Sequence, residues 1–249
     1  MNESIDKLKI YFNTIKNKKL NKSLRIGTTG IGYTFESLIN KKEDNNFLPD
    51  FEGIEIKTKL GYTKSSTTLF CLTPKKDNND FAIKFILENF GYPNKSNKDF
   101  KSFKGDVYST CNNVIGSKYI FKLKINYKEQ KIYLIIADKS LNIINNSIFW
   151  SFNDLKTRLC IKLNYLAYIK GYPYHIDGET FYKYTNLTIY KLKNFDTFLN
   201  LIEQGYIYIT FNIGIFDKEY RYGEIHDRGT AFKLKKNSIN KLFDKIDSI

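Results

Sequence analysis

Three observations predict an α+β fold for this chain of 249 residues. In some segments apolar residues recur three or four positions apart, as on one face of a helix, and in others they alternate with polar residues, as on a strand. These segments do not follow the strict β-α-β order of a doubly wound sheet. Hydrophobic residues make up 42% and aromatic residues 16% of the chain, which is enough to bury a sizeable core.

The N-terminal segment predicts an amphipathic helix, because its apolar residues form a stripe. The residues of this stripe are Ile5, Leu8, Phe12 and Ile15. A glycine-rich turn at 27–32 then leads into a short helix that directs Phe35, Leu38 and Ile39 inward. This turn is not a P-loop, because a P-loop requires a Gly-Lys-Ser/Thr ending and a preceding strand.

Residues 53–59 alternate Ile54 and Ile56 with charged residues, which predicts a strand with one polar face. Further strands are expected at 67–72, 119–127, 131–137, 165–169, 206–216 and 231–234. Helices are expected at 81–90, from Ser151 to Leu163, at 195–204 before Gly205, and at 238–246. The rest of 74–113 is polar, rich in lysine and poorly periodic.

The charge balance favours a polyanionic partner. Lys and Arg total 40 against 26 Asp and Glu, a formal net charge of +14, which is typical first of nucleic-acid binding and second of an anionic membrane. The alternative is a compositional bias, because an AT-rich coding sequence enriches lysine whatever the function. The chain has only four arginines, so each is informative, since a guanidinium makes bidentate contacts that an ammonium cannot.

Three widely separated cysteines without a C-x-x-C pair predict a reduced, cytoplasmic protein. With two histidines in the chain, a zinc site of ordinary spacing is not expected. The N-terminus has no apolar signal region, and no apolar run approaches the roughly 20 residues of a membrane span, so we expect neither secretion nor membrane insertion.

The segment 49–57, PDFEGIEIK, contains the groups needed for metal-assisted phosphodiester hydrolysis. Glu55 and Lys57 lie two apart on a strand and leave the same face, and Asp50 ends the preceding loop. The two carboxylates are hard oxygen ligands for Mg²⁺, which activates water, while Lys57 can hold or deprotonate that water. The alternative is a solvated ion pair on an exposed strand, because an E-x-K triplet often occurs by chance.

The pattern P-D-x(4)-E-x-K resembles the PD-(D/E)xK nuclease motif, and its surroundings are similar to the MutH-related restriction endonucleases of the MvaI/BcnI type. The matching pieces are GTTGIGYTFE at 27–36, PDF at 49–51, IEIKT at 54–58, KS at 64–65, TLF at 68–70, WSF at 150–152, YKY at 182–184, HD at 226–227 and GTAF at 229–232. Each piece is weak alone, but their common order over most of the chain is specific.

The resemblance implies a PD-(D/E)xK core, in which helices flank a mixed central sheet, and a smaller DNA-recognition lobe. We place the mainly catalytic lobe at 1–140 and the mainly recognition lobe at 141–249, with interleaving allowed. The enzyme would act as a monomer on double-stranded DNA, with no membrane and no obligate protein partner.

The resemblance also implies that Asp50 and Glu55 are the metal ligands, for Mg²⁺ or in its place Mn²⁺, and that Lys57 is the catalytic lysine. Glu36 would be an outer catalytic acid that orients water. The alternative for Glu36 is a glutamate in the N-terminal turn that stabilises the helix dipole.

By the same resemblance, one set of residues would contact DNA: Lys64, Ser65, Asn212, Arg221, His226, Asp227, Arg228 and Lys233. Lys64 and Ser65 would approach the backbone, unless this is a solvated loop. The loop 221–230 would read bases, unless it is a charged hairpin tip with an internal Asp/Arg ion pair. His175 is expected to be structural.

The recognition residues depart from the family pattern. Arg228 stands where the pattern has a second histidine, Lys233 replaces a base-reading arginine, and 210–214 lacks the acidic and arginine residues used on the inner G·C pairs. Asn212 suits adenine. We therefore expect a target other than CCWGG, with A·T pairs inside it.

The sequence thus predicts a Mg²⁺-dependent type II restriction endonuclease that leaves 5′-phosphate and 3′-hydroxyl ends. One alternative is a MutH-like mismatch-repair nickase, which would require an activating partner. The other is a basic DNA-binding module without catalysis, whose carboxylates serve only the structure.

Overall fold

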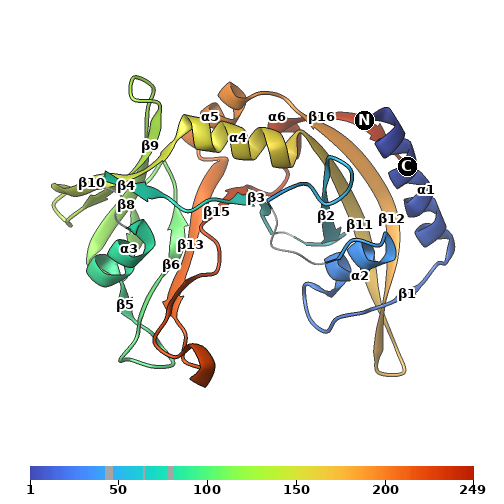
Figure 1. Ribbon diagram of the computed structural model, residues 1–249, viewed down its shortest axis with the longest axis horizontal. Helices are drawn as coiled ribbons and strands as arrows, with labels where there is room; N and C mark the ends of the chain where they lie inside the picture. The colour runs from blue at the N-terminus through green and yellow to red at the C-terminus, as the bar shows by residue number, and fades with distance from the viewer. Residues whose placement is uncertain (43–46, 64, 78–80) are drawn as a thin grey trace. The chain divides into compact units, whose positions relative to one another are not determined.

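The computed structural model describes residues 1–42, 47–63, 65–77 and 81–249 and confirms the α+β class (Figure 1). The chain folds as two compact units, each built from separate segments. The first unit comprises Met1–Ser65, Arg158–Asn194 and Ile239–Ile249, and the second comprises Ser66–Thr157 and Phe195–Ser238. Both halves of the sequence therefore contribute to both units. No described helix is long and apolar enough to cross a membrane.

The first unit contains a sheet in the order β1 (Asn21–Lys22), β12 (Glu179–Leu192), β11 (Tyr165–Ile176) and β2 (Ile54–Leu60), and β16 (Phe243–Ser248) also pairs with β12. The long β11–β12 pair is antiparallel, whereas β2 runs parallel to β11, with Tyr165 opposite Ile54. This parallel pairing matters for the site, because it brings the beginning of β2 beside the segment that precedes β11.

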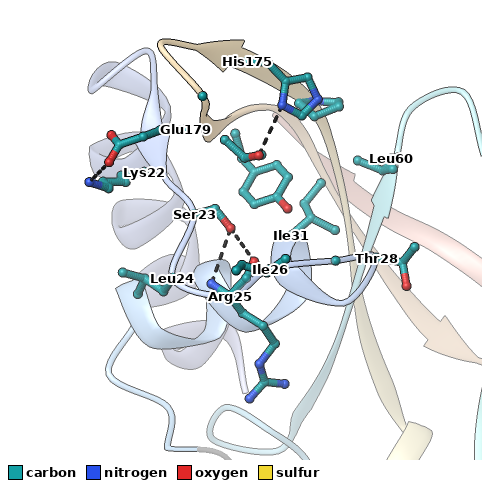
Figure 2. Close-up of a pocket in the computed structure, with 15 residues that line it drawn as sticks. Lys22, Ser23, Leu24, Arg25, Ile26, Thr28, Ile31, Leu60, His175 and Glu179 are labelled. Atoms are coloured by element: carbon teal, nitrogen blue, oxygen red, sulfur yellow. Dashed lines mark hydrogen bonds and ion pairs between the residues drawn. The ribbon is translucent and has the colours of Figure 1, made fainter.

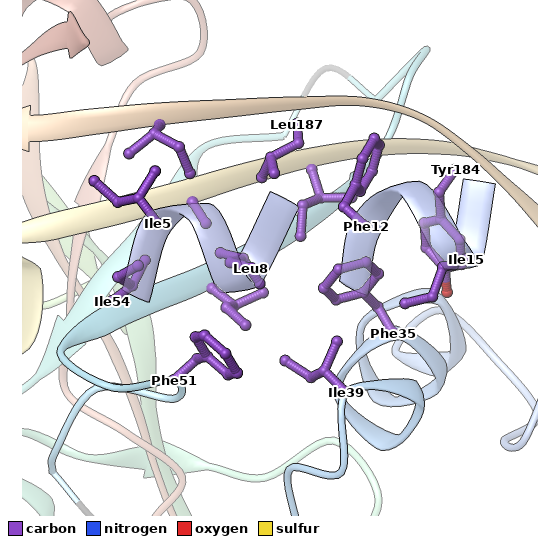
Figure 3. Packing of buried hydrophobic residues seen from close by; sticks show 14 of the residues in the cluster. Ile5, Leu8, Phe12, Ile15, Phe35, Ile39, Phe51, Ile54, Tyr184 and Leu187 are labelled. Carbon is purple, nitrogen blue, oxygen red and sulfur yellow. The ribbon is translucent and has the colours of Figure 1, made fainter. Parts of the chain in front are cut away.

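Two helices cover this sheet and form its core. Helix α1 (Asn2–Asn17) buries the predicted apolar stripe, and α2 (Gly30–Leu38) buries Phe35, whose ring meets Tyr184 of β12 edge-on at 5.2 Å (Figure 3). Each fully buried aromatic or aliphatic side chain stabilises the fold by roughly 1.5–3 kcal/mol. Since Ile54 and Ile56 belong to the same cluster, β2 is held firmly on its apolar face.

The second unit contains two sheets. The first has the order β4 (Lys75–Lys76), β10 (Ile143–Ser151), β9 (Lys131–Ala137), β8 (Tyr119–Asn126) and β7 (Asn113–Ile115). All of its pairings are antiparallel.

The other sheet has the order β3 (Thr67–Cys71), β15 (Ala231–Leu234), β13 (Ile207–Ile215), β6 (Lys101–Val107) and β5 (Tyr92–Pro93), with β14 (Ile225–Asp227) also on β13. The helical elements outside these sheets are α3 (Ala82–Phe90), α4 (Phe152–Leu163), α5 (Phe195–Glu203), the 3-10 turn Glu219–Arg221 and α6 (Ile239–Leu242).

Aromatic side chains fill the core of the second unit. Phe70 stacks on Phe232 at 4.9 Å, Phe103 meets Phe211 edge-on at 5.2 Å, and Trp150 donates its indole hydrogen to the carbonyl of Leu72. The phenylalanines that make these contacts on β13, β6 and β15 point to one face of the sheet. The residues next to them along each strand point to the opposite face, which can therefore carry polar side chains.

Some predicted elements are wrong. The expected helix at 238–246 ends at Leu242, and the chain continues as β16, because Phe243 pairs with Leu192 of β12 at the edge of the sheet. The expected short strand at 165–169 extends to Ile176 as half of a hairpin. Strand β6 is not among the predicted elements, since its glycine and four polar or charged residues hide the alternation around Phe103.

Candidate active site

Strand β2 places Glu55 and Lys57 on one face, as the alternation predicts. The apolar residues Ile54 and Ile56 point into the core, so the side chains of Glu55 and Lys57 leave the opposite face. Lys57 Nζ lies 2.5 Å from Glu55 Oε1. The Glu55 side chain is 1% exposed and that of Lys57 is 25% exposed. A buried carboxylate and a partly exposed ammonium therefore form the centre of the site, unlike the fully solvated pair of the alternative interpretation.

A tight turn brings Asp50 next to these residues. Phe51 and Ile54 exchange two backbone hydrogen bonds, and the residues between them, Glu52 and Gly53, have φ angles of 44° and 88°. This left-handed turn reverses the chain, and Asp50 Oδ2 then accepts a hydrogen bond of 2.9 Å from the backbone N–H of Ile56. Three of the four predicted catalytic residues, Asp50, Glu55 and Lys57, are thus brought together.

The sequence analysis missed a second lysine at the site. Lys162, near the end of α4, places its Nζ 3.0 Å from Glu55 Oε2 and is 16% exposed. Its Nζ also lies 3.5 Å from the carbonyl of Leu48, just before Asp50. The signal in the sequence is weak: Lys162 adjoins the buried Leu163 and follows Leu159 by three positions, so it lies at the border of the helix's apolar face.

The electrostatics of Glu55 reflect opposing influences. Burial raises the pKa of this carboxyl, and the nearby Asp50 charge raises it further, while Lys57 and Lys162 act in the opposite direction. The net direction is upward. The charged form of a buried carboxyl beside a second carboxylate is stabilised by nearby cations, which here are Lys57 and Lys162.

Glu36 lies beside the same strand. It lines a cavity of about 370 Å³ together with Ile56, Lys57 and Thr58 of β2 and with Arg25 of the glycine-rich segment. Glu36 is the seventh of the nine residues of α2, whose first turn holds no acidic residue. The alternative role, stabilisation of the N-terminal turn, is therefore wrong, because the helix dipole favours acids at the opposite end.

A larger cavity, of about 710 Å³, lies between the segment 22–28 and the β11–β12 hairpin (Figure 2). It shares Arg25, Thr28 and Ile31 with the cavity at Glu36. His175 lines it from the hairpin, where its Nδ1 lies 3.2 Å from the Thr180 hydroxyl.

The residues present fit a Mg²⁺ ion. Asp50 and Glu55 supply two hard carboxylates, and the buried Glu55 Oε2 makes no hydrogen bond beyond its ion pair with Lys162, so it can serve as a ligand atom. Within the described ranges, no group of three or more His, Cys, Asp or Glu side chains is placed to hold a metal. Two carboxylates suit Mg²⁺, which commonly retains several waters.

The predicted DNA-contacting residues fall into two places. Ser65 lies in the first unit, where Lys59 Nζ contacts its carbonyl at 3.1 Å and its hydroxyl at 3.2 Å. Lys64 lies outside the described residues. All the others belong to the second unit, on β13, β15 and the segment 221–228.

In that segment, the predicted internal Asp/Arg pair is replaced by other contacts. Arg221 Nε lies 2.7 Å from Glu224, and the Asp227 carboxylate accepts hydrogen bonds from Gly229 N–H and from the backbone and hydroxyl of Thr230. Asp227 thus holds the turn that presents the exposed Arg228.

His226 lies against the backbone of β13. It pairs with Gly214, where an added Cβ would lie 3.1 Å from the imidazole, and its ring stands 4.5 Å from Phe216. Burial and the charges of nearby Arg228 and Lys104 lower the pKa of His226, so the ring is neutral at neutral pH. Its buried Nδ1 has no hydrogen bond.

The comparisons with known proteins identify the family of the chain. Residues 10–243 match the model of the MvaI/BcnI restriction endonuclease family. The solved complex of the restriction endonuclease MvaI with its cognate DNA substrate is 30% identical, covering 99% of this chain and 98% of that chain, with a TM-score of 0.88. The structure of MvaI without DNA gives the same identity and coverage and a TM-score of 0.64. No curated protein matches. The chain therefore belongs to the MvaI/BcnI restriction endonuclease family and is a type II site-specific deoxyribonuclease.

Proposed function

We propose that Asp50, Glu55 and Lys57 hydrolyse phosphodiester bonds of double-stranded DNA with Mg²⁺ as cofactor, on a PD-(D/E)xK core. The observation that carries this proposal is the buried Glu55 carboxylate, with Lys57 on one oxygen and Asp50 close enough to act on its charge. A solvated ion pair would leave Glu55 exposed, whereas a buried carboxylate keeps its charge only beside cations, which here are Lys57 and Lys162.

Each residue has a chemical task in this proposal. Asp50 and Glu55 would hold Mg²⁺, which supplies charge neutralisation at the scissile phosphate and a lowered pKa for the attacking water. Lys57 would position that water and offset negative charge in the transition state. Glu36 would accept a hydrogen bond from water in the cavity that it shares with Lys57. The products would carry 5′-phosphate and 3′-hydroxyl ends.

The DNA is proposed from the named relative, which was solved with its cognate DNA substrate. The formal charge of +14 supports a polyanionic ligand. Ser65 and Lys64 would meet the backbone, and Asn212, Arg221, His226, Arg228 and Lys233 would face the bases, with Asp227 ordering their turn. The enzyme would act in the cytoplasm as a monomer, without an activating protein.

Plasmid cleavage by the purified chain tests this proposal. With Mg²⁺ and no other protein, we expect defined fragments, which chelation abolishes and Mg²⁺ or Mn²⁺ restores. Asp50→Asn keeps a hydrogen-bond acceptor for the Ile56 N–H but removes the charge, so it should abolish cleavage while sequence-specific binding persists. The matched control is Asp177→Asn at the β11–β12 turn, which should cleave normally. An active Asp50→Asn enzyme would show that the site is misplaced, and a requirement for a second protein would favour a nickase.

A further inference from the structure

We propose that Asp106 on β6 is a specificity-determining residue that accepts a hydrogen bond from a cytosine amino group, with Lys104 on the same strand as its partner for guanine. The inference rests on the proposed function, because it requires that this unit contacts DNA. Neither residue belongs to a strand predicted from the sequence.

The register of the sheet aligns these side chains in rows. Thr210 of β13 lies opposite Asp106, and Asn212 lies opposite Lys104. The Thr210 hydroxyl donates a hydrogen bond of 2.6 Å to Asp106 Oδ1, which shows that the two side chains meet on one face. Because residues two apart on a strand share a face, Lys104 and Asn212 lie on this same face.

The opposite face is the core of the unit. Phe103, Val107, Ile209, Phe211 and Ile213 are each at most 1% exposed. The polar face has the reverse character, since Lys104 and Asp106 are exposed and Thr210 and Asn212 are half-buried. It is therefore a surface with donors and acceptors at regular intervals.

The ends of this face are also defined. At one end Tyr108 stacks on Tyr208 at 4.5 Å, and Lys235 lies over the Tyr108 ring. At the other end His226 covers Gly214. Asp106 and Lys104 thus stand in the middle of a surface bounded by aromatic rings.

The charges around Asp106 indicate that its carboxylate has a specific hydrogen-bond donor on the DNA. Lys104 on this face and Arg228 and Arg221 of the neighbouring segment all lie close enough to His226 to act on its charge, so several cations lie near this end of the face. A carboxylate placed against DNA phosphates is repelled, and it therefore weakens binding unless it meets a donor. The major-groove donors open to a carboxylate are the amino groups at cytosine N4 and adenine N6, and cytosine suits it better because the adenine amino group adjoins the N7 acceptor. A lysine can donate to O6 and N7 of the paired guanine.

The hydrogen bonds of Asp106 leave room for such a contact. Among the described residues, the only hydrogen-bond partner of its carboxylate is Thr210, at Oδ1. This bond fixes the orientation of the side chain, as the outer hydrogen bonds of recognition groups do. The second oxygen is open to a donor on the DNA.

The DNA target should reflect this pair of side chains. On β6, the Asp106 carboxylate would accept from cytosine and the Lys104 ammonium would donate to guanine. Strand β13 has no such side chains for a C·G pair. We therefore expect at least one obligatory C·G pair beside any A·T pair that Asn212 contacts.

The test compares the preferences of the wild type, Asp106→Asn and Lys104→Ala. Cleavage of a random-sequence library followed by sequencing of the ends gives the target, and single duplexes then give kcat/KM. We expect Asp106→Asn to lose on the order of 10- to 100-fold on the wild-type target and to relax discrimination at one C·G pair. Lys104→Ala should relax the same or the adjacent pair.

Asp99→Asn, in an exposed loop of the same unit, is the matched control and should leave the target unchanged. Thr210→Val should give a weaker form of the Asp106→Asn effect. Thermal melting shows whether each variant is folded.

Two results would overturn the inference: an Asp106→Asn enzyme with the wild-type target and unchanged kcat/KM, or a wild-type target without a C·G pair. Failure of the proposed function looks different, because the wild type itself would not cut DNA. If the wild type does not cut, duplexes bound by Asp50→Asn and by the double variant Asp50→Asn/Asp106→Asn can be selected from a random library. Comparison of their sequences still measures whether Asp106 sets a base preference.

Discussion

Lys162 Nζ lies 3.0 Å from Glu55 Oε2, while Lys57 contacts the other oxygen of the same carboxylate. Glu55 is 1% exposed, so its charge is balanced by two ammonium groups rather than by water. The site therefore depends on a residue more than one hundred positions away in the sequence, and both ammonium groups should contribute to stability.

Lys162→Met should destabilise the protein by about 1–3 kcal/mol, because it leaves a buried carboxylate with one cation in place of two. Urea unfolding measures the change. In a double-mutant cycle, Glu55→Gln combined with Lys162→Met should cost less than the sum of the single changes, since the neutral amide introduced by Glu55→Gln needs no second cation. Strict additivity of the two changes would show that the pair is not coupled.

Lys57→Ala should reduce cleavage by at least about 100-fold, the loss typical when one preorganised group for transition-state charge is removed. DNA binding should change little, because the effect is on the chemical step. Single-turnover cleavage and a binding assay in Ca²⁺ separate the two quantities. Lys16→Ala, which removes an exposed lysine on α1, is the control for loss of positive charge alone and should keep the cleavage rate.

Gly30→Ala should destabilise the first unit by about 1–3 kcal/mol. An added Cβ would lie 2.4 Å from the Arg25 carbonyl oxygen and 2.6 Å from the Tyr182 hydroxyl, so the backbone must move. Gly32→Ala is the matched control, because its nearest neighbour, Glu36 Oε1, would be 3.8 Å away. That change should be neutral or stabilise the helix by up to about 1 kcal/mol. Equal effects in thermal unfolding would contradict this account of the glycine-rich turn.

Protonation of His226 should lower stability in mild acid. Its pKa is lowered from 6.5 in the folded protein by burial and by Arg228, Lys104 and Arg221, with Asp227 acting in the opposite direction. Between the two pKa values the unfolded chain binds more protons, so stability is lost as the pH falls below about 6.5. His226→Asn should remove this part of the pH dependence, as unfolding at a series of pH values would reveal. An NMR titration of the ring that gave a pKa above 6.5 would refute the assignment.

The polar face of β6 and β13 shows where sequence patterns are weak. Alternation predicts strand β13 but not its neighbour β6, because Gly105 and charged residues interrupt the apolar pattern around Phe103 and Val107. The apolar pattern therefore does not predict a strand that carries Asp106 and Lys104. Only the register with Thr210 and Asn212 places them on the polar face.

The local sequence by itself determined the α+β class, the helix of the N-terminal stripe, the placement of Glu55 and Lys57 on one face of a strand and, by resemblance, the family. These features depend on residues a few positions apart, because the geometry of a helix or strand determines which of their side chains share a face. The tertiary structure decided what surrounds them: the burial of Glu55, the arrival of Lys162 through the parallel pairing of β11 with β2, and the position of Glu36 away from the N-terminal turn of α2. Contacts between distant segments arise from how sheets and helices pack, and no short spacing in the chain encodes them.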